Sequence, residues 1–180
     1  MAKIIQLSEI AFKKETTTTE GTPQTLSNAN CVMPVYDITY KPNIEFYRRS
    51  TRSNYFSRFA GVAGKRMASI GFKFDLIGNT AASTAPAWAT LANAAGIITT
   101  LAGTTNTLTP ASRWNPLDLS ASNDFDCLTM GFYTDGRYRE ITGARPSSFK
   151  IVAEAGKPLR GEVEFIGAAA SDPSTVALLT

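Results

Sequence analysis

This sequence indicates a mainly β domain with one α-helix packed on a sheet or sandwich. Several segments alternate apolar and polar residues, the pattern of half-buried strands. Turn-forming residues separate some of these segments, as in β-hairpins. A single segment has the apolar spacing of an amphipathic helix, which favours one helix against many strands. With 180 residues, the chain is long enough for one domain with a substantial core.

The first predicted hairpin lies near the C-terminus. From Leu128 to Tyr133, apolar residues alternate with polar or small ones, so we expect a half-buried strand. Asp135-Gly136 follows, and this dipeptide favours a type I′ turn. The return strand is expected to end at Gly143. The turn would pair Thr134 with Arg137, Tyr133 with Tyr138, and Met130 with Ile141.

A second hairpin is predicted directly afterwards. Its strands are Phe149–Glu154 and Leu159–Phe165, joined by a turn at Ala155-Gly156-Lys157-Pro158. Upstream, Ser69–Gly78 alternates clearly and is predicted to be an amphipathic strand. The segment Ile38–Tyr47 also looks extended, and its Pro42 indicates an edge position or a bulge.

The predicted helix begins near Pro86, with Thr84 as its cap, and ends near Gly96. Its buried stripe consists of Trp88, Leu91, Ala92 and Ala95. We expect irregular chain at Lys14–Ala29, Thr99–Pro116 and Ala169–Thr180. The resulting division is an N-terminal arm (1–35), a β domain (36–168) and a C-terminal tail (169–180).

Composition argues against an enzyme. The chain has no histidine, which excludes Ser–His and Cys–His nucleophile systems within it. Cys31 and Cys127 are not spaced as a zinc or redox motif, and we expect two reduced thiols, with a disulfide left open. Glu162 and Glu164 share one strand face, where a solvated pair is expected. No catalytic residue, metal site or cofactor is therefore predicted.

The chain also lacks the sequence features of membrane insertion. No stretch offers about 20 continuous apolar residues, and the N-terminus lacks a long apolar core. We therefore expect no membrane partner and no export through a secretory pathway.

A basic segment from Arg48 to Arg66 contains no acidic residue, and the net charge of the whole chain is only +3. Loops as long as Arg49–Lys65 are usually functional or disordered. A protein interface, a solvated loop and a nucleic-acid site are all compatible with its residues. Gly61–Lys65 lacks the spacing of a phosphate-binding loop. The candidate contact residues are Arg48, Arg49, Arg52, Tyr55, Phe56, Arg58, Phe59, Lys65 and Arg66.

Three motifs occur in an order that resembles the tail tube proteins of long-tailed, siphovirus-like bacteriophages. They are Ala85-Pro86-Ala87-Trp88 before a short helix, Asp135-Gly136 followed by Ile141–Arg145, and Glu154–Gly167. The resemblance begins at about Ala68, continues into the C-terminal region and covers about 100 of the 180 residues. It implies a β-sandwich or barrel-like domain with one flanking α-helix and long loops.

The same resemblance implies a structural subunit of the virion tail, assembled in the host cytoplasm. Such subunits form rings, typically hexameric, that stack into a hollow tube through which the genome passes. The basic segment would bridge stacked rings. Expected partners are further copies of this chain, the tape measure, terminator and distal tail proteins, and double-stranded DNA in transit without specific binding. Because a cationic wall would hold phosphates, the basic residues should lie away from the lumen.

Other functions remain open from the sequence. A tail terminator ring or a secretion-type tube ring would use a similar subunit. A monomeric β-sandwich that binds carbohydrate belongs to a different class, as does a small nucleic-acid-binding barrel that uses the basic segment.

Overall fold

The computed structural model describes residues 8–15, 21–30, 33–48, 61–78, 84–102, 105–110, 126–134, 137–169 and 174–175. The chain is mostly β with one short helix, as predicted. Its elements are β1 (Ser8–Lys14), η1 (Asn28–Asn30), β2 (Val35–Tyr47), β3 (Val62–Asp75), α1 (Ala89–Ala94), β4 (Ile97–Ala102), β5 (Thr105–Pro110), β6 (Leu128–Thr134), β7 (Arg137–Val152), β8 (Arg160–Ala169) and β9 (Ser174–Thr175). Predictions for Cys31 and for the Asp135-Gly136 turn lie outside the described residues.

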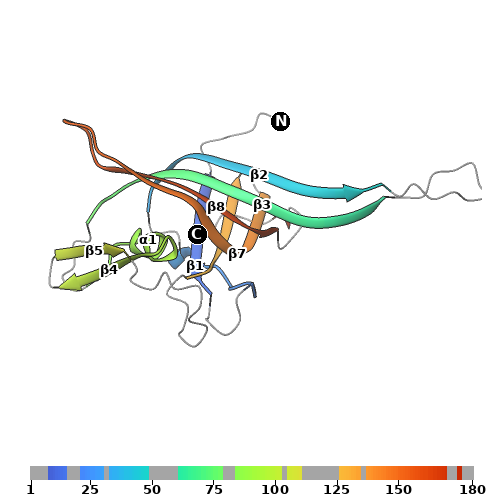
Figure 1. Cartoon of the computed structure of the whole chain (residues 1–180), viewed down its shortest axis with the longest axis horizontal. Coiled ribbons are helices and arrows are strands. Elements are labelled where there is room, and N and C mark those ends of the chain that lie inside the picture. The colour runs from blue at the N-terminus through green and yellow to red at the C-terminus, as the bar shows by residue number, and fades with distance from the viewer. Residues whose placement is uncertain are drawn as a thin grey trace, which may run out of the picture.

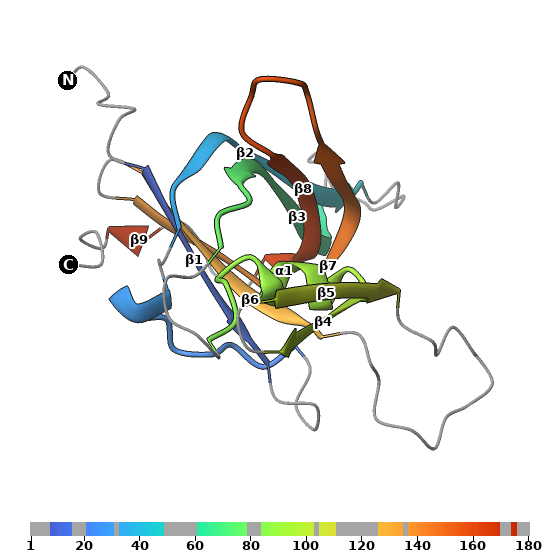
Figure 2. The same ribbon diagram turned by 90° about the vertical axis from the view of Figure 1, so that its left-hand side faces the viewer.

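One antiparallel sheet dominates the structure. Its strands follow the order β1-β6-β7-β8-β3-β2, and β9 pairs with the start of β7. The sheet curls around α1, and β1 and β6 cross the direction of β2 and β3 (Figures 1 and 2). The small β4–β5 hairpin lies beside α1. Among the described strands, β1 and β2 remain at opposite ends of the sheet, so its barrel-like curvature does not close.

Strand β7 divides the sheet into two wings. Its first part pairs with β6 and its second part with β8. We call β1, β6 and residues 137–142 the short wing, and β2, β3, β8 and residues 145–152 the long wing. The prediction that Gly143 ends this strand is wrong. Gly143 has φ 58° and sits at a register shift, so its left-handed backbone redirects the strand instead of ending it.

Both predicted hairpins are confirmed. Thr134 pairs with Arg137, Tyr133 with Tyr138, and Met130 with Ile141. The second hairpin pairs Val152 with Arg160, and its turn contains Gly156 at φ 80°. Pro42 lies on β2, which is an edge strand, as predicted.

The core lies where the two wings face each other. Its fully buried side chains include Ile70, Phe74 and Phe165 of the long wing and Leu128, Met130 and Ile141 of the short wing. Leu91 of α1 adds to this cluster. The residue alternation along β3 and β8 therefore directs Ile70, Phe72, Phe74, Val163 and Phe165 into the core.

The helix is shorter than predicted. It begins at Ala89 with Trp88 as its N-cap residue, and no side chain caps it, so the prediction of Thr84 as the cap is wrong. Trp88 is anchored instead by its indole Nε1, which donates to Ile77 O at 3.0 Å. Gly96, at φ 75°, ends the helix as predicted, because glycine adopts this left-handed conformation readily.

Strand β6 is buried on both faces, although a half-buried strand was predicted. Its inward side chains join the core, and residues 21–30 lie against the opposite face. Gln24 N donates to Thr129 Oγ1 at 3.1 Å, and Leu26 packs over Gly131. The sequence of β6 showed the alternation of a strand, but it did not show that residues 21–30 would cover the outer face of this strand.

Glu15 links residue 21, at the start of the segment that covers β6, to β6 itself and to the bend in β7. Its side chain is buried, and Oε1 accepts hydrogen bonds from Thr129 Oγ1 and Gly143 N, both at 2.8 Å. Oε2 accepts a bond from Gly21 N at 2.6 Å. The carboxylate therefore joins β6, the bend in β7 and residue 21.

Two predicted connections contain regular structure. Strand β3 begins at Val62, so the end of the predicted loop Arg49–Lys65 belongs to a strand; β2 and β3 form a long hairpin that projects beyond the sheet (Figure 1). The start of the predicted connection Thr99–Pro116 lies in the β4–β5 hairpin. The tail Ala169–Thr180, predicted to be irregular, contains β9, which pairs with β7. Backbone pairing, which local composition did not show, explains all three differences.

Candidate functional site

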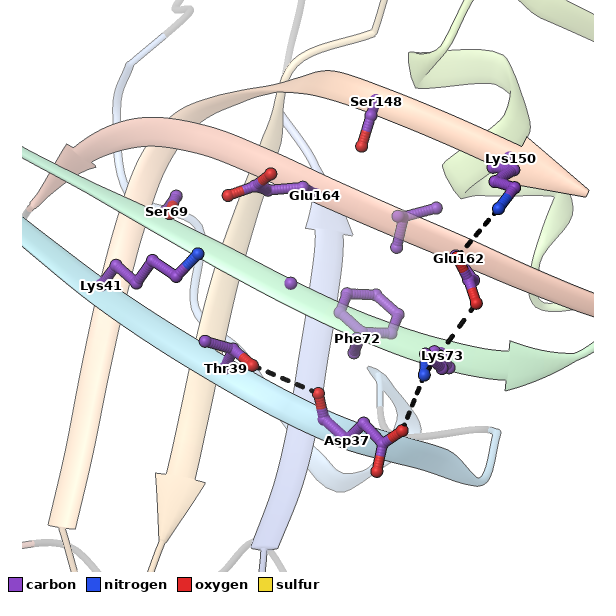
Figure 3. Close-up of a pocket in the computed structure, with 12 residues that line it drawn as sticks. Asp37, Thr39, Lys41, Ser69, Phe72, Lys73, Ser148, Lys150, Glu162 and Glu164 are labelled. Carbon is purple, nitrogen blue, oxygen red and sulfur yellow. Dashed lines mark hydrogen bonds and ion pairs between the residues drawn. The ribbon is translucent and has the colours of Figure 1, made fainter.

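The exposed face of the long wing is polar and carries balanced charge. Four strands contribute alternate residues to it, and a shallow depression of about 310 Å³ runs across it (Figure 3). Its charged residues are Lys41, Lys73, Lys150, Asp37, Glu162 and Glu164. Three cations therefore share this face with three carboxylates.

A chain of ion pairs crosses the strands. Lys73 Nζ lies 2.9 Å from Asp37 Oδ2 and 3.9 Å from Glu162 Oε1, and Glu162 Oε2 lies 3.8 Å from Lys150 Nζ. Strand register places these residues together, because Glu162 is directly opposite Lys73 on one side and Lys150 on the other. The hydrogen bond to Asp37 raises the pKa of Lys73 above its ordinary value.

This face is suited to contact with water and passing solutes rather than to catalysis. Glu162 and Glu164 share one face of β8, as predicted, and both are partly exposed. Glu162 is paired with lysines. Within the described ranges, no group of three or more acidic or cysteine side chains could hold a metal ion.

The long wing has two sheet edges without a partner strand in the described part of the chain. One is the outer edge of β2, and the other is residues 145–152 of β7, beyond the end of its pairing with β6. Exposed edges present backbone donors and acceptors that can pair with another chain. Pro42 and Pro146 lack an N–H and interrupt these edges.

The structure places three of the nine predicted contact residues. Arg48, Lys65 and Arg66 are exposed in the outer part of the β2–β3 hairpin, where Arg66 pairs with Ile44 and Arg48 directly follows β2. The remaining candidates, Arg49, Arg52, Tyr55, Phe56, Arg58 and Phe59, lie outside the described residues. Their role as contacts stays a prediction.

The sequence did not indicate an apolar stripe on the same hairpin. Tyr40 of β2 packs on the core and stacks with Phe132, with ring centroids 6.3 Å apart. Ile44 and Phe46 continue this alternation past the body of the sheet, where they are 45% and 70% exposed. The alternating apolar residues can be read in the sequence of β2. The sequence does not show at which of these residues the core ends and exposure to solvent begins.

A further buried polar contact is at Cys127. This residue is buried, and Arg145 Nε donates to its Sγ at 3.1 Å. The contact lies close to the bend in β7. It ties the long wing to the first residues before β6.

None of the helices in the described ranges has the length and apolarity needed to cross a membrane.

Comparison with known proteins gives a family match over nearly the whole chain. A family model described as "Phage tail tube protein" matches residues 6–180. One similar solved structure is described as the tail of an empty GTA particle with C6 symmetry; the identity is 14%, the TM-score is 0.43, and the match covers 93% of this chain and 96% of that chain. Among curated proteins, none matches this sequence.

Proposed function

Because the chain belongs to the phage tail tube protein family, we propose that it is the major subunit of a siphovirus-like tail tube. Six copies close a ring, and stacked rings form the conduit that delivers the genome into the host. The family is structural, and the chain is a virion tail protein and not an enzyme. Its assembly takes place in the host cytoplasm.

The two unpartnered edges of the long wing are the observation that carries ring formation. The wing has the order β7-β8-β3-β2 with antiparallel neighbours, so its two edge strands run in opposite directions. When a second copy lies beside the first in the same orientation, residues 145–152 of β7 run antiparallel to the neighbour's β2. The sheet therefore continues from copy to copy, and a ring removes both free edges.

The balanced polar face supports a wall that does not hold DNA. A surface that neutralises many phosphates binds DNA in a salt-dependent way. On this face each of Lys73 and Lys150 has an acidic neighbour, so the net charge of the six residues is zero. With this face toward the lumen, double-stranded DNA passes without specific binding, although the whole chain is slightly basic.

The basic segment serves contacts between rings in this proposal. Arg48, Lys65 and Arg66 lie on the hairpin that projects beyond the sheet (Figure 1), farther out along the two strands than Lys41 and Ser69 of the balanced face. The other six candidates follow in sequence between the two strands. The tape measure, terminator and distal tail proteins are the further partners expected for such a tube.

Negative-stain electron microscopy with mass photometry tests the proposal. The expected particles are sixfold rings with a central hole, with a mass six times 19.4 kDa, and tubes at higher protein concentration. A terminator would give single rings without tubes. Monomers at every concentration, even with an initiator complex added, would contradict the proposal.

Hydrogen exchange measured by mass spectrometry tests the lateral edges separately. Assembly should slow exchange in residues 35–47 and 145–152, because their backbone groups gain partners from neighbouring copies. The β4–β5 hairpin, which lies beside α1, serves as the internal control. Unchanged exchange in both edges of assembled protein would mean that rings close through other surfaces.

A further inference from the structure

A pocket of about 460 Å³ opens at the end of β3 that lies opposite the projecting hairpin. Its described lining is largely apolar and comes from Met33, Pro34, Ile77, Ala85, Pro86 and Trp88. Ile77 is 59% exposed at this site. The Trp88 indole is held in place by its hydrogen bond to Ile77 O, so the wall is preformed. Preformed apolar concavities of this size commonly receive a ligand or a side chain.

Asp75 adds a polar feature to the pocket wall. Its Oδ2 accepts a hydrogen bond from Tyr36 at 2.5 Å. Its Oδ1 is buried and accepts none within the described part of the chain, and Arg160 Nε lies 3.6 Å away. The carboxylate as a whole is partly exposed, so it gives the pocket wall a negative charge that a neighbouring cation can approach.

The β2–β3 hairpin lies at the other end of β3 and carries side chains that are complementary to the pocket. Its outer part exposes the apolar side chains of Ile44 and Phe46 and the basic side chains of Arg48 and Lys65. An apolar insert with neighbouring cations matches an apolar pocket that contains a carboxylate. Exposed aromatic and arginine side chains are also the residues that most often anchor interfaces.

The positions of the two surfaces set a geometry for stacking. Strand β3 runs from Val62 at the hairpin to Asp75 at the pocket. At roughly 3.3 Å per residue, these ends are about 43 Å apart. Copies displaced by about this length along the strand bring the hairpin of one to the pocket of the next, and such a head-to-tail contact repeats without closing.

We propose that the pocket is a socket for the β2–β3 hairpin of a second copy in the adjacent ring. Phe46 and Ile44 pack against Ile77 and the wall that Trp88 forms, and a basic side chain of the hairpin lies beside the partly exposed carboxylate of Asp75. This inference rests on the proposed tube function and adds the receiving surface of the contact between rings.

Crosslinking between two single-cysteine variants tests the contact. Phe46→Cys and Ile77→Cys are each built in a background in which Cys31 and Cys127 are replaced by serine, so that each chain has one cysteine. The two chains are mixed, assembled into tubes, and treated with a flexible bismaleimide, because a disulfide would demand stricter geometry. A crosslinked dimer is expected in mixed tubes and not in tubes of either variant or of the cysteine-free background. The matched control mixes Phe46→Cys with Ile166→Cys, which is 39% exposed on β8. Tubes in which both mixtures crosslink equally would overturn the inference.

A charge substitution provides the second test. Ile77→Arg places a cation in the apolar part of the socket, and the expected result is loss of tubes with rings retained. The exposed position of Ile77 limits the effect on folding, which urea denaturation checks. If Ile77→Arg tubes are as abundant as wild-type tubes, the socket is refuted and the tube function stands. If wild-type protein forms neither rings nor tubes, both proposals fail.

Discussion

The buried carboxylate of Glu15 offers the sharpest test of how this fold is held together. Its two oxygens accept three hydrogen bonds, from Thr129 Oγ1, Gly143 N and Gly21 N. In Glu15→Gln the single remaining oxygen can keep the two bonds now made by Oε1. The new amide then points a donor at the N–H of Gly21, and the third bond is lost.

The cost of this substitution follows from the kinds of bond that change. Hydrogen bonds to a charged group contribute about 1.5–3 kcal/mol each, and neutral ones about 1 kcal/mol. One charged bond disappears and two become neutral, so the loss summed over the bonds is about 2.5–7 kcal/mol. Because a neutral amide costs less to bury than a carboxylate, we expect Glu15→Gln to lower the free energy of unfolding by an amount near the lower end, about 2–4 kcal/mol. With a urea dependence of about 2 kcal/mol/M, the midpoint should fall by roughly 1–2 M.

The assay is urea denaturation at a protein concentration where wild type is monomeric, because assembly would add stability to the folded state. Glu9→Gln is the matched control, since Glu9 lies on β1, the strand that Glu15 directly follows, and is partly exposed. It should change stability by less than about 0.5 kcal/mol. A Glu15→Gln midpoint within about 0.3 M of wild type would refute the reasoning, because the carboxylate would then contribute nothing that a neutral amide cannot.

Two further substitutions test the core and the proposed lumen. Gly161→Ala should destabilise the protein by about 1–3 kcal/mol in thermal or urea unfolding, because its Cβ would lie 2.3 Å from Cζ of the fully buried Phe74. Gly71→Ala, whose nearest contact would be 3.6 Å, is the control, and equal losses would contradict this account. Glu162→Gln combined with Glu164→Gln removes two negative charges from the balanced face. Assembled tubes of this variant should retain double-stranded DNA at low salt and release it as salt rises, as measured by co-sedimentation; retention equal to wild type would argue against a lumen lined by this face.

Local signals made much of the fold predictable. An Asp-Gly dipeptide between two alternating segments determined the pairing of Tyr133 with Tyr138, because a two-residue loop leaves one register. Gly143 shows the limit of such reasoning. A glycine that follows an alternating segment can mark the end of the strand or a bulge within it. At Gly143 it marks a bulge, because the second part of β7 continues by pairing with β8.

Contacts between distant segments were not predictable from local patterns. Strand β1 pairs with β6, and Glu15 bonds to Thr129, 114 residues away. The candidate site has the same character. Lys73 and Glu162 were placed on outward faces, but their meeting depends on β3 and β8 being neighbours. The apolar stripe at Phe46 was missed because exposure depends on where the core ends.

The two wings leave different surfaces unsatisfied, which argues for different roles. In the short wing, β6 is covered on both faces, and Glu15 has a donor for each oxygen. The long wing carries two unpartnered edges and the exposed side chain of Phe46. The short wing has such features too, because the outer edge of β1 and the buried Thr134 Oγ1 also lack a partner in the described part of the chain. The long wing differs in that its two edges run antiparallel to each other when copies lie side by side in the same orientation. Another copy placed beside it or along β3 can therefore complete its edges and cover Phe46, while the short wing holds the fold together before assembly.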